Sequence, residues 1–514
     1  MLETSQEYKD AVYGISRRVH GRVDFEILDV TASGDATATV TSELEISRKQ
    51  DMFNRERQLK TKYATLENDF WRLDGSYTLP TNPISDEIGY ISADLSGSDG
   101  VFATPQEVEI NFTENHSSIG LTITFDGLNK EFATEFVIFV YDEFDSLIHQ
   151  ENVVGNTKVR YILEENLPEY RRIVVSFAKT NNPYRRIRIV EFDFGIVDEY
   201  EGDELIEFSL VEELDTISNT ISPDEFKFTI ENEDLRFDIL NPDGIYPFLQ
   251  RRQEIKPFLG VEVEGGDIEY IPLGIYYLIN WKSNEGALTA TFTARDLLDI
   301  LEQSNFGGNV YSNVSLKAIA EEVLDDAGVE EYEIDNALDG VVTSGELESD
   351  TYKNTLQTIC IAGQAVCYMN RFNVLVIERL GETGTGELID FDNIYASPSI
   401  DLDKLVNTIV VEHQGNKLTY VDPEKPGREQ TLAVEVENPL ISSSQHAEDV
   451  AIWILGELKK RYLYEVRWRQ NPALEVGDIV TLQTDYGNKL SRINKQEFEF
   501  RGYLAGKTYT KGGD

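Results

Sequence analysis

Apolar and polar residues alternate strictly in several short runs between about residues 75 and 200. The apolar positions of these runs are Val108, Ile110 and Phe112; Leu121, Ile123 and Phe125; Ile173, Val175 and Phe177; and Ile187 and Ile189. Turn signals separate the runs, at Asp126-Gly127, Gly155-Asn156 and Asn181-Asn182-Pro183. Period-two runs with turns at this spacing are typical of an antiparallel β-sandwich. We therefore predict one sandwich domain over 75–200, with no helix in it.

Short β-type runs also occur on both sides of this segment. In 1–74, runs at 23–27 and 38–41 on either side of Gly34-Asp35 predict an opening hairpin, and the basic stretch 47–62 fits a helix or an extended arm. In 201–304, Phe226, Phe228 and Ile230 alternate and Asn241-Pro242-Asp243-Gly244 predicts a turn. Runs at 258–263, 271–279 and 288–293, with Gly265-Gly266 as a hairpin tip, then predict a small barrel or half-barrel.

The apolar period changes to that of a helix between 312 and 380. One helix is predicted by Leu316, Ile319, Ala320, Val323, Leu324 and Ala327, with Gly328 as its stop. A second is predicted to begin at Asp350 as N-cap, with Tyr352, Leu356, Ile359, Cys360 and Gly363 on one face. A hairpin of 366–369 and 373–378 completes an α+β module over 305–384. The remainder, 385–514, is predicted to form strands and one helix. A capping box of Ser442 and Gln445 marks the start of this helix. A strand at 474–482 and a hairpin around Tyr486-Gly487-Asn488 close this segment.

Length and charge narrow the class of protein. A chain of 514 residues fits three or four domains. Its 93 acidic and 46 basic residues give a net charge of −47, which argues against nucleic-acid binding. Two interpretations of this charge remain: solubility in a crowded particle, and a channel whose carboxylates repel passing DNA. The sequence has no run of about 18 apolar residues and no basic-then-apolar start, so we predict neither membrane insertion nor a secretory signal.

Few residues suit metal binding or nucleophilic catalysis. The histidines (His20, His116, His149, His413 and His446) do not have zinc-ligand spacing. Cys360 and Cys367 are predicted to lie two turns apart on one helix face, too far for a disulfide, and we interpret both as small buried residues. A Cys-His hydrolase would need one of them beside a histidine, and their apolar surroundings disfavour this.

Motifs for catalysis are also missing from the sequence. No segment matches a nucleophile elbow, a phosphate-binding loop or a Rossmann fingerprint. The acidic clusters 198–204 and 321–326 lack the spacing of a calcium loop, so we interpret them as solvated charge, and no pattern singles out a glycosidase pair. We predict no enzymatic activity, no cofactor, and no catalytic, cofactor-binding or metal-binding residues.

The sandwich segment contains candidate ligand contacts. Trp71, Tyr77, Tyr90 and Tyr184 lie in or near turns, where rings can stack on a glycan or plug the ends of the sandwich. Arginines also cluster in this segment of an acidic protein: Arg171, Arg172, Arg185, Arg186 and Arg188. They can pair with acidic neighbours, which is our first interpretation, or contact an anionic glycan.

Three stretches resemble tail hub proteins of phages and phage-derived particles that infect Gram-positive bacteria. Residues 64–76 (ATLENDFWRLDGS) resemble the lead-in to an inserted sandwich, and residues 179–186 (KTNNPYRR) resemble its last turn. Residues 208–215 (FSLVEELD), 222–230 (SPDEFKFTI) and 240–244 (LNPDG) resemble the opening of the hub fold. Residues 294–298 (ARDLL) and 474–482 add to the resemblance, which covers most of the chain.

This resemblance implies a mainly β fold with an α+β module. Two small hub β-barrels are expected at 201–304 and 385–514, the module at 305–384, and a jelly-roll sandwich similar to carbohydrate-binding modules at 75–200. The strands of 1–74 are candidates to complete the first barrel. In such hubs three subunits, each with two similar barrels, form a pseudo-sixfold ring around the channel. The ring joins the tail tube or distal tail protein to the central spike, and the tape measure protein and DNA pass through it.

We therefore predict a structural baseplate hub, a homotrimer that also contacts other baseplate subunits. It is expected to assemble in the bacterial cytoplasm and to reside at the tail tip of a virion or of a phage tail-like particle, such as a tailocin or another contractile injection system. The alternative is a receptor-binding protein that grips a cell-wall glycan through the 75–200 sandwich. The sequence ends at Asp514 without a peptidase or lysozyme domain, so we expect any wall-cutting activity in a partner.

Overall fold

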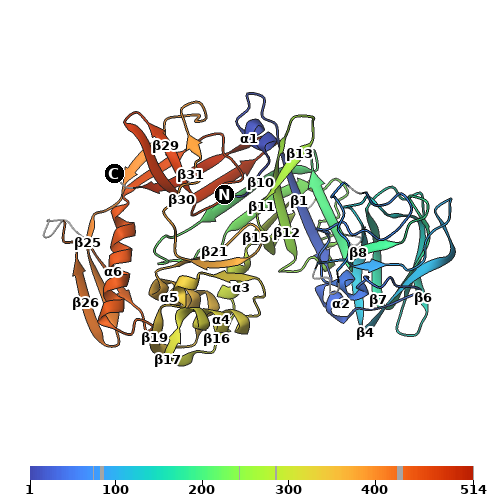
Figure 1. Ribbon diagram of the computed structural model, residues 1–514, viewed down its shortest axis with the longest axis horizontal. Helices are drawn as coiled ribbons and strands as arrows, with labels where there is room; N and C mark the ends of the chain where they lie inside the picture. The colour runs from blue at the N-terminus through green and yellow to red at the C-terminus, as the bar shows by residue number, and fades with distance from the viewer. Residues whose placement is uncertain (73, 82–85, 242–243, 284–285, 425–431, 513–514) are drawn as a thin grey trace. The chain divides into compact units, whose positions relative to one another are not determined.

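The computed structural model describes residues 1–72, 74–81, 86–241, 244–283, 286–424 and 432–512 (Figure 1). Over these ranges the chain is mainly β, as predicted, and divides into two compact units. Unit 1 comprises Met1–Asp24, Glu199–Gly244 and Glu254–Asp514, and unit 2 comprises Phe25–Asp198 and Ile245–Gln253. None of the helices in the described ranges combines the length and the apolar character that crossing a bilayer requires.

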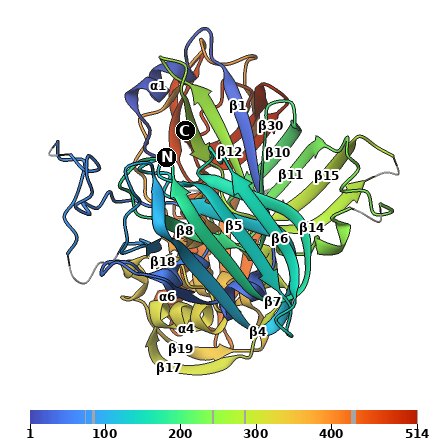
Figure 2. The same cartoon turned by 90° about the vertical axis from the view of Figure 1, so that its right-hand side faces the viewer.

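Unit 2 contains an antiparallel β-sandwich, whose strands face the viewer in Figure 2. Its sheet has the order β3-β8-β4-β7-β5-β6, with β2 paired to β4. Register shifts along the β4–β7 pair let these two long strands bend, so that the sheet encloses one core. The apolar residues of the predicted runs are buried in that core, and the predicted jelly-roll type of fold is confirmed. The elements are α2 (Val30–Asp35), β2 (Thr37–Val40), η1 (Lys49–Phe53), β3 (Tyr90–Ile91), β4 (Val101–Phe125), β5 (Ala133–Tyr141), β6 (Leu147–Val154), β7 (Arg160–Thr180), β8 (Arg188–Asp193) and η2 (Tyr246–Phe248).

One large sheet forms the frame of unit 1. Its order is β24-β28-β31-β30-β10-β11-β15-β14-β12-β1-β9; β13 also pairs with β12, β29 with β30, and β23 with β29. The strands β1 (Val19–Leu28) and β9 (Gly195–Glu201) cross the boundary between the units. The others are β10 (Leu205–Glu213), β11 (Glu225–Glu231), β12 (Glu254–Glu262), β13 (Ile268–Pro272), β14 (Tyr276–Ser283), β15 (Thr289–Arg295), β23 (Leu388–Ile389), β24 (Ser399–Leu402), β28 (Tyr462–Val466), β29 (Ile479–Thr484), β30 (Gly487–Phe500) and β31 (Leu504–Gly512).

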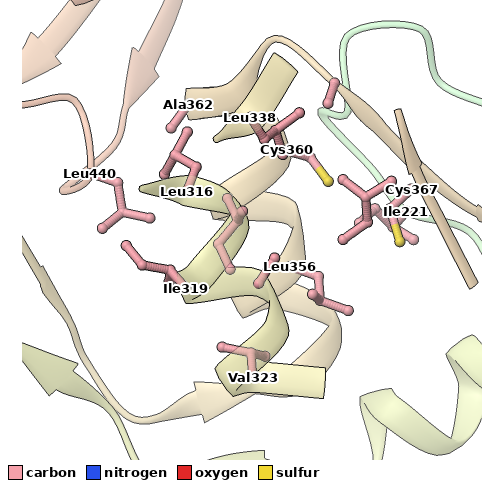
Figure 3. Packing of buried hydrophobic residues seen from close by; sticks show 14 of the residues in the cluster. Ile221, Leu316, Ile319, Val323, Leu338, Leu356, Cys360, Ala362, Cys367 and Leu440 are labelled. Carbon is pink, nitrogen blue, oxygen red and sulfur yellow. The ribbon is translucent and has the colours of Figure 1, made fainter. Parts of the chain in front are cut away.

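Helices and short strands form the rest of unit 1. The helices between residues 297 and 459 share one apolar core, part of which Figure 3 shows around Leu316, Ile319, Leu356 and Cys360. Tyr8 and Val12 of the N-terminal helix pack in a separate cluster. The predicted helix with its stop at Gly328 is confirmed as α4, and the hairpin predicted over 366–378 is β21–β22. The helices are α1 (Gln6–Val12), α3 (Leu297–Glu302), α4 (Leu316–Asp326), η3 (Asn336–Leu338), α5 (Tyr352–Gly363) and α6 (Ser444–Lys459). The strands are β16 (Asn305–Phe306), β17 (Asn309–Ser315), β18 (Tyr332–Ile334), β19 (Val342–Leu347), β20 (Asp350–Thr351), β21 (Val366–Met369), β22 (Leu375–Glu378), β25 (Val406–His413), β26 (Asn416–Val421) and β27 (Leu432–Glu437).

The opening hairpin predicted around Gly34-Asp35 is wrong. A helix, α2, separates the two strands, because the Asp29 side chain accepts hydrogen bonds from the backbone N–H groups of Thr31 and Ala32 and so caps it. The strand β1 then pairs with β12 and β9, whereas β2 pairs with β4. The basic stretch 47–62 contains only the short helix η1.

The predicted helix starts in unit 1 are each displaced by one residue. Thr351, and not Asp350, caps α5, since its hydroxyl accepts the N–H of Asn354. Ser443 caps α6 by accepting the N–H of His446, so the capping box of Ser442 and Gln445 is wrong. Several adjacent polar residues can cap a helix. The residue that does so has extended backbone and directly precedes the first helical turn.

The prediction that Cys360 and Cys367 share a helix face is also wrong. The helix α5 ends at Gly363 because Gln364 adopts the left-handed conformation at φ 56°, which turns the chain into β21. Cys360 therefore lies on the helix and Cys367 on the strand (Figure 3), both as free, buried thiols in one core. Their interpretation as buried residues is confirmed.

Two predicted runs are shorter than expected. The run 271–279 is split between β13 and β14, because Pro272 has no N–H to donate and Gly274 adopts φ 110°. The strand predicted over 474–482 begins only at Ile479, after a turn in which Gly477 adopts φ 91°. The predicted turn at 241–244 includes residues 242 and 243, which lie outside the described ranges.

Candidate functional site

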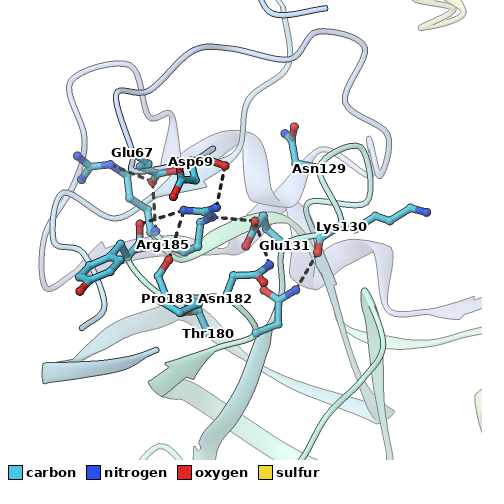
Figure 4. Close-up of polar contacts among 12 residues, drawn as sticks. Glu67, Asp69, Asn129, Lys130, Glu131, Thr180, Asn182, Pro183 and Arg185 are labelled. Carbon is cyan, nitrogen blue, oxygen red and sulfur yellow. Dashed lines mark hydrogen bonds and ion pairs between the residues drawn. The ribbon is translucent and has the colours of Figure 1, made fainter. Parts of the chain in front are cut away.

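One end of the sandwich brings together the two stretches that resemble an inserted domain's lead-in and last turn. Figure 4 shows the contacts, which centre on Arg185. Its Nε donates to Glu131 Oε1 at 2.9 Å, and its Nη1 donates to the carbonyl oxygen of Asn68 at 2.6 Å. Arg188 Nη2 donates to Glu67 Oε2 at 2.6 Å and to the hydroxyl of Thr65 at 2.8 Å. These bonds hold the segment around 65–69 against the start of β8.

The charges at this end of the sandwich are matched internally. The side chain of Glu67 is fully buried and pairs with both Arg186, at 3.2 Å, and Arg188. Burial raises the pKa of Glu131, and its hydrogen bond and attraction to Arg185 oppose this rise. Burial also lowers the pKa of Arg186, and Glu67 opposes that fall. The predicted pairing of these arginines with acidic neighbours is what the contacts show, so they are not free for an anionic glycan.

The four aromatic candidates have different environments. Tyr90 is fully buried, and its hydroxyl donates to the carbonyl oxygen of Ser42, so it belongs to the core. Tyr77 is partly buried and donates to Asn129 Oδ1 at 3.0 Å. Trp71 is partly exposed. Tyr184 is 42% exposed and adopts φ 55° in the turn before Arg185, which makes it the candidate best placed to stack on a ligand.

The two remaining arginines lie elsewhere on the sandwich. Arg172 forms a salt bridge with Asp145 at 2.9 Å and lies over the ring of Tyr141. Arg171 Nε donates to the carbonyl oxygen of Phe112 at 3.1 Å. The structure therefore separates the predicted cluster into a group of three at one end of the sandwich and two arginines with partners of their own.

A buried histidine of unit 2 is also fully paired. His116 lies between Asp29 and Asp35, with 3.0 Å from a ring nitrogen to a carboxylate oxygen on each side. Burial raises the pKa of Asp35, but hydrogen bonds from Thr113, from the N–H of Glu114 and from His116 lower it well below its usual value. Within the described ranges, no group of three His, Cys, Asp or Glu residues is arranged to hold a metal ion.

Unit 1 has a different feature, a joint between two groups of strands. Strands from 205–295 and strands from 462–512 meet where β10 pairs with β30. In this antiparallel pair Phe208 lies opposite Phe500, with their rings stacked at 5.2 Å, and Leu210 lies opposite Phe498. Residues almost 300 positions apart are thus joined by main-chain hydrogen bonds.

A buried arginine ties a third part of unit 1 to this joint. Arg371, in the turn between β21 and β22, donates from Nε to Glu212 Oε1 at 3.0 Å and from Nη2 to Glu212 Oε2 at 2.9 Å. It also donates to the carbonyl oxygens of Pro472 and Leu474. Burial raises the pKa of Glu212, and Arg371 opposes this rise. The arrangement can hold three sequence segments together.

Signals for these contacts are weak in the sequence. Glu67 cannot be told apart from the other acidic residues of the chain, and Glu212 lies at the end of an ordinary alternating strand. Arg371 was identifiable in principle, because it is a charged residue in a tight turn between two apolar strands.

The sequence matches no protein-family model and no curated protein. Among solved structures, the fold is similar to a 43 kDa prophage tail protein from Shewanella oneidensis at a TM-score of 0.43 and 14% identity, over 61% of this chain and 94% of that one. It is similar to a prophage tail protein from Listeria monocytogenes at a TM-score of 0.41 and 13% identity, over 61% and 91%. A family 32 carbohydrate-binding module from C. perfringens, solved with galactose, is similar at a TM-score of 0.22 and 13% identity, over 34% and 99%. Tail proteins and carbohydrate-binding modules are therefore among its structural neighbours, at low identity.

Proposed function

We propose that the chain is a non-enzymatic structural subunit at the tip of a phage tail or phage tail-like particle. Three copies form a ring in which each contributes two groups of strands, one from 201–304 and one from 385–514. The ring joins the tail tube to the central spike and surrounds the channel. The module at 305–384 lies between the two groups in sequence, and the sandwich of 75–200 is an insertion.

The β10–β30 joint is the observation that supports this proposal. Each subunit has two groups of strands side by side, so three copies supply six groups. Such a ring can contact a sixfold-symmetric tail tube on one side and a threefold-symmetric spike on the other. The fusion is made through backbone hydrogen bonds of Phe208–Glu213 with Lys495–Phe500, so the two groups cannot move independently. A rigid arrangement of this kind suits a subunit that must match the shape and symmetry of its neighbours.

Immunogold electron microscopy tests the location. Tail particles are purified from cells that carry the gene and labelled with an antibody against the full chain. The expected result is gold at the distal end of the tail. Labelling along the whole tail, or none on intact or disassembled particles, contradicts the proposal.

The exposed ring of Tyr184 favours a second candidate function, the binding of a cell-wall glycan by the sandwich. The full chain is mixed with purified cell walls, and the bound fraction is compared for the wild type, Tyr184→Ala and the control Phe144→Ala, whose ring is 77% exposed at another turn. Loss of binding in Tyr184→Ala alone supports glycan recognition at this end. Equal binding by all three proteins, or no binding by any, removes this candidate.

A further inference from the structure

A groove in unit 1 is lined by negative charge. Its volume is about 690 Å³, and it lies between the end of β19, the start of α5 and the ends of β25 and β27. No Lys or Arg is among its described lining residues, whereas five carboxylates are: Glu346, Glu348, Asp350, Glu412 and Glu437. Such a surface repels anions and attracts cations.

A buried histidine without a hydrogen-bond partner lines the same groove. His413, the last residue of β25, is only 6% exposed, and its Nδ1 makes no hydrogen bond to any described residue. A buried polar atom left in this state costs free energy, which a bound hydrogen-bonding partner would recover. The groove therefore contains one ring nitrogen that a ligand can pair.

Several of the carboxylates are also available. Glu346, Glu348 and Glu437 are exposed and form no salt bridge with the described residues, whereas Glu412 pairs with Lys417. Glu346 and Glu348 flank the buried Leu347, so both lie on the solvent side of the chain, two residues apart. Two neighbouring carboxylates suit a planar cation with several donors.

A metal ion fits less well than an organic cation. The described residues contain no group of three ligand side chains arranged around one point. The volume of the groove is also in the range of pockets that hold an organic ligand. Arginine, with five donors in a fixed fork, can bond two carboxylates at once.

We propose that this groove binds a short arginine-bearing peptide segment of a partner protein. The guanidinium donates to Glu346 and Glu348, and a second polar group of the segment pairs with Nδ1 of His413. This docking site goes beyond the hub function, since it identifies a surface and a partner chemistry that a ring of three copies does not require.

Fluorescence anisotropy on the full chain tests the proposal. The probe is fluorescein-labelled Gly-Arg-Gly-Arg-Gly, with Gly-Glu-Gly-Glu-Gly as the comparison peptide. The arginine peptide is expected to bind and the glutamate peptide not to bind. Glu346→Gln/Glu348→Gln is expected to weaken binding about tenfold or more. The matched control Glu143→Gln/Glu165→Gln removes the same charge from exposed positions of unit 2 and is expected to change binding less than about twofold.

A second variant separates the groove from general attraction to an acidic protein. His413→Phe keeps the net charge of the protein and is expected to weaken binding of the arginine peptide. Thermal unfolding confirms that each variant is folded. Equal weakening by both charge-removing pairs, or no binding of the arginine peptide, overturns the proposal. Calorimetry with Ca²⁺ gives a further test. The proposal is overturned if Ca²⁺ binds stoichiometrically, displaces the peptide, and no longer binds to Glu346→Gln/Glu348→Gln, because the groove would then be a metal-ion site.

Discussion

Replacing Arg371 by methionine removes the charge that joins the β21–β22 turn to the strand joint. Arg371 and Glu212 are each 4% exposed, and the substitution removes both hydrogen bonds to the carboxylate as well as those to the carbonyl oxygens of Pro472 and Leu474. Methionine has a similar length, so the change leaves little empty volume. What it leaves is a buried carboxylate without its partner.

The expected cost follows from that uncompensated group. Breaking a buried ion pair by removing one partner destabilises a protein by about 3–5 kcal/mol. Glu212 then takes up a proton more readily, since burial raises its pKa and Arg371 no longer opposes the rise. The double variant Arg371→Met/Glu212→Gln leaves no buried charge and is expected to recover part of the loss, as pairs replaced by neutral residues of similar size often do.

Urea unfolding followed by tryptophan fluorescence measures this cost. Three of the four tryptophans, Trp281, Trp453 and Trp468, lie in unit 1, so most of the signal reports on the unfolding of that unit. The control is Arg501→Gln, which breaks an exposed salt bridge of 3.0 Å to Glu207 and is expected to cost less than about 1 kcal/mol. If Arg371→Met costs no more than Arg501→Gln, the three segments are not held together at this arginine.

Three further predictions concern single residues. Burial, with the nearby charge of Asp193, raises the pKa of Glu191 from 4.5 to about 10; its contribution to the stability of unit 2 is therefore complete below pH 4.5 and is lost as pH rises toward 10. Glu191→Gln is expected to flatten this slope in thermal melts between pH 5 and 9, and an unchanged slope contradicts the assignment. Glu67→Gln removes the carboxylate that Arg186 and Arg188 share and is expected to lower the stability of unit 2 by about 2–4 kcal/mol in urea unfolding, with no loss as the refuting result. Thr351→Ala is expected to cost about 1 kcal/mol in urea unfolding, and it should cost more than Asp350→Ala if Thr351 is the cap of α5.

The local pattern of apolar and polar residues predicted most elements of the fold. Alternation at Val108, Ile110 and Phe112 marks the buried face of β4, because successive side chains of a strand point to opposite faces. The spacing of Leu316, Ile319 and Val323 marks the buried face of α4 for the corresponding helical reason. Both signals come from residues close together in the sequence, which is why they could be read directly.

Strand partners could not be predicted in the same way. Phe208 pairs with Phe500, and nothing in either strand identifies the other, since alternation specifies which face is buried and not which neighbour covers it. The predicted hairpin at Gly34-Asp35 failed for this reason, because each of its strands pairs with a distant one. Helix starts differed by one residue, as at Ser443, because several adjacent polar residues can serve as a cap.

The candidate site was predictable only in part. The cluster of arginines was visible in the sequence, and its pairing was the first interpretation. Its partner Glu67 was not, because a carboxylate more than a hundred residues away becomes a neighbour only after the sandwich closes. The acidic groove around His413 was also hidden, since its carboxylates come from three segments that meet only in the folded unit.

Cryo-electron microscopy of the purified full chain tests whether the protein forms the proposed ring. We expect closed rings of three chains, about 175 kDa from a chain mass of 58.4 kDa, with six groups of strands around a central channel. Particles that contain a single chain, or two chains related by a twofold axis, would contradict this proposal.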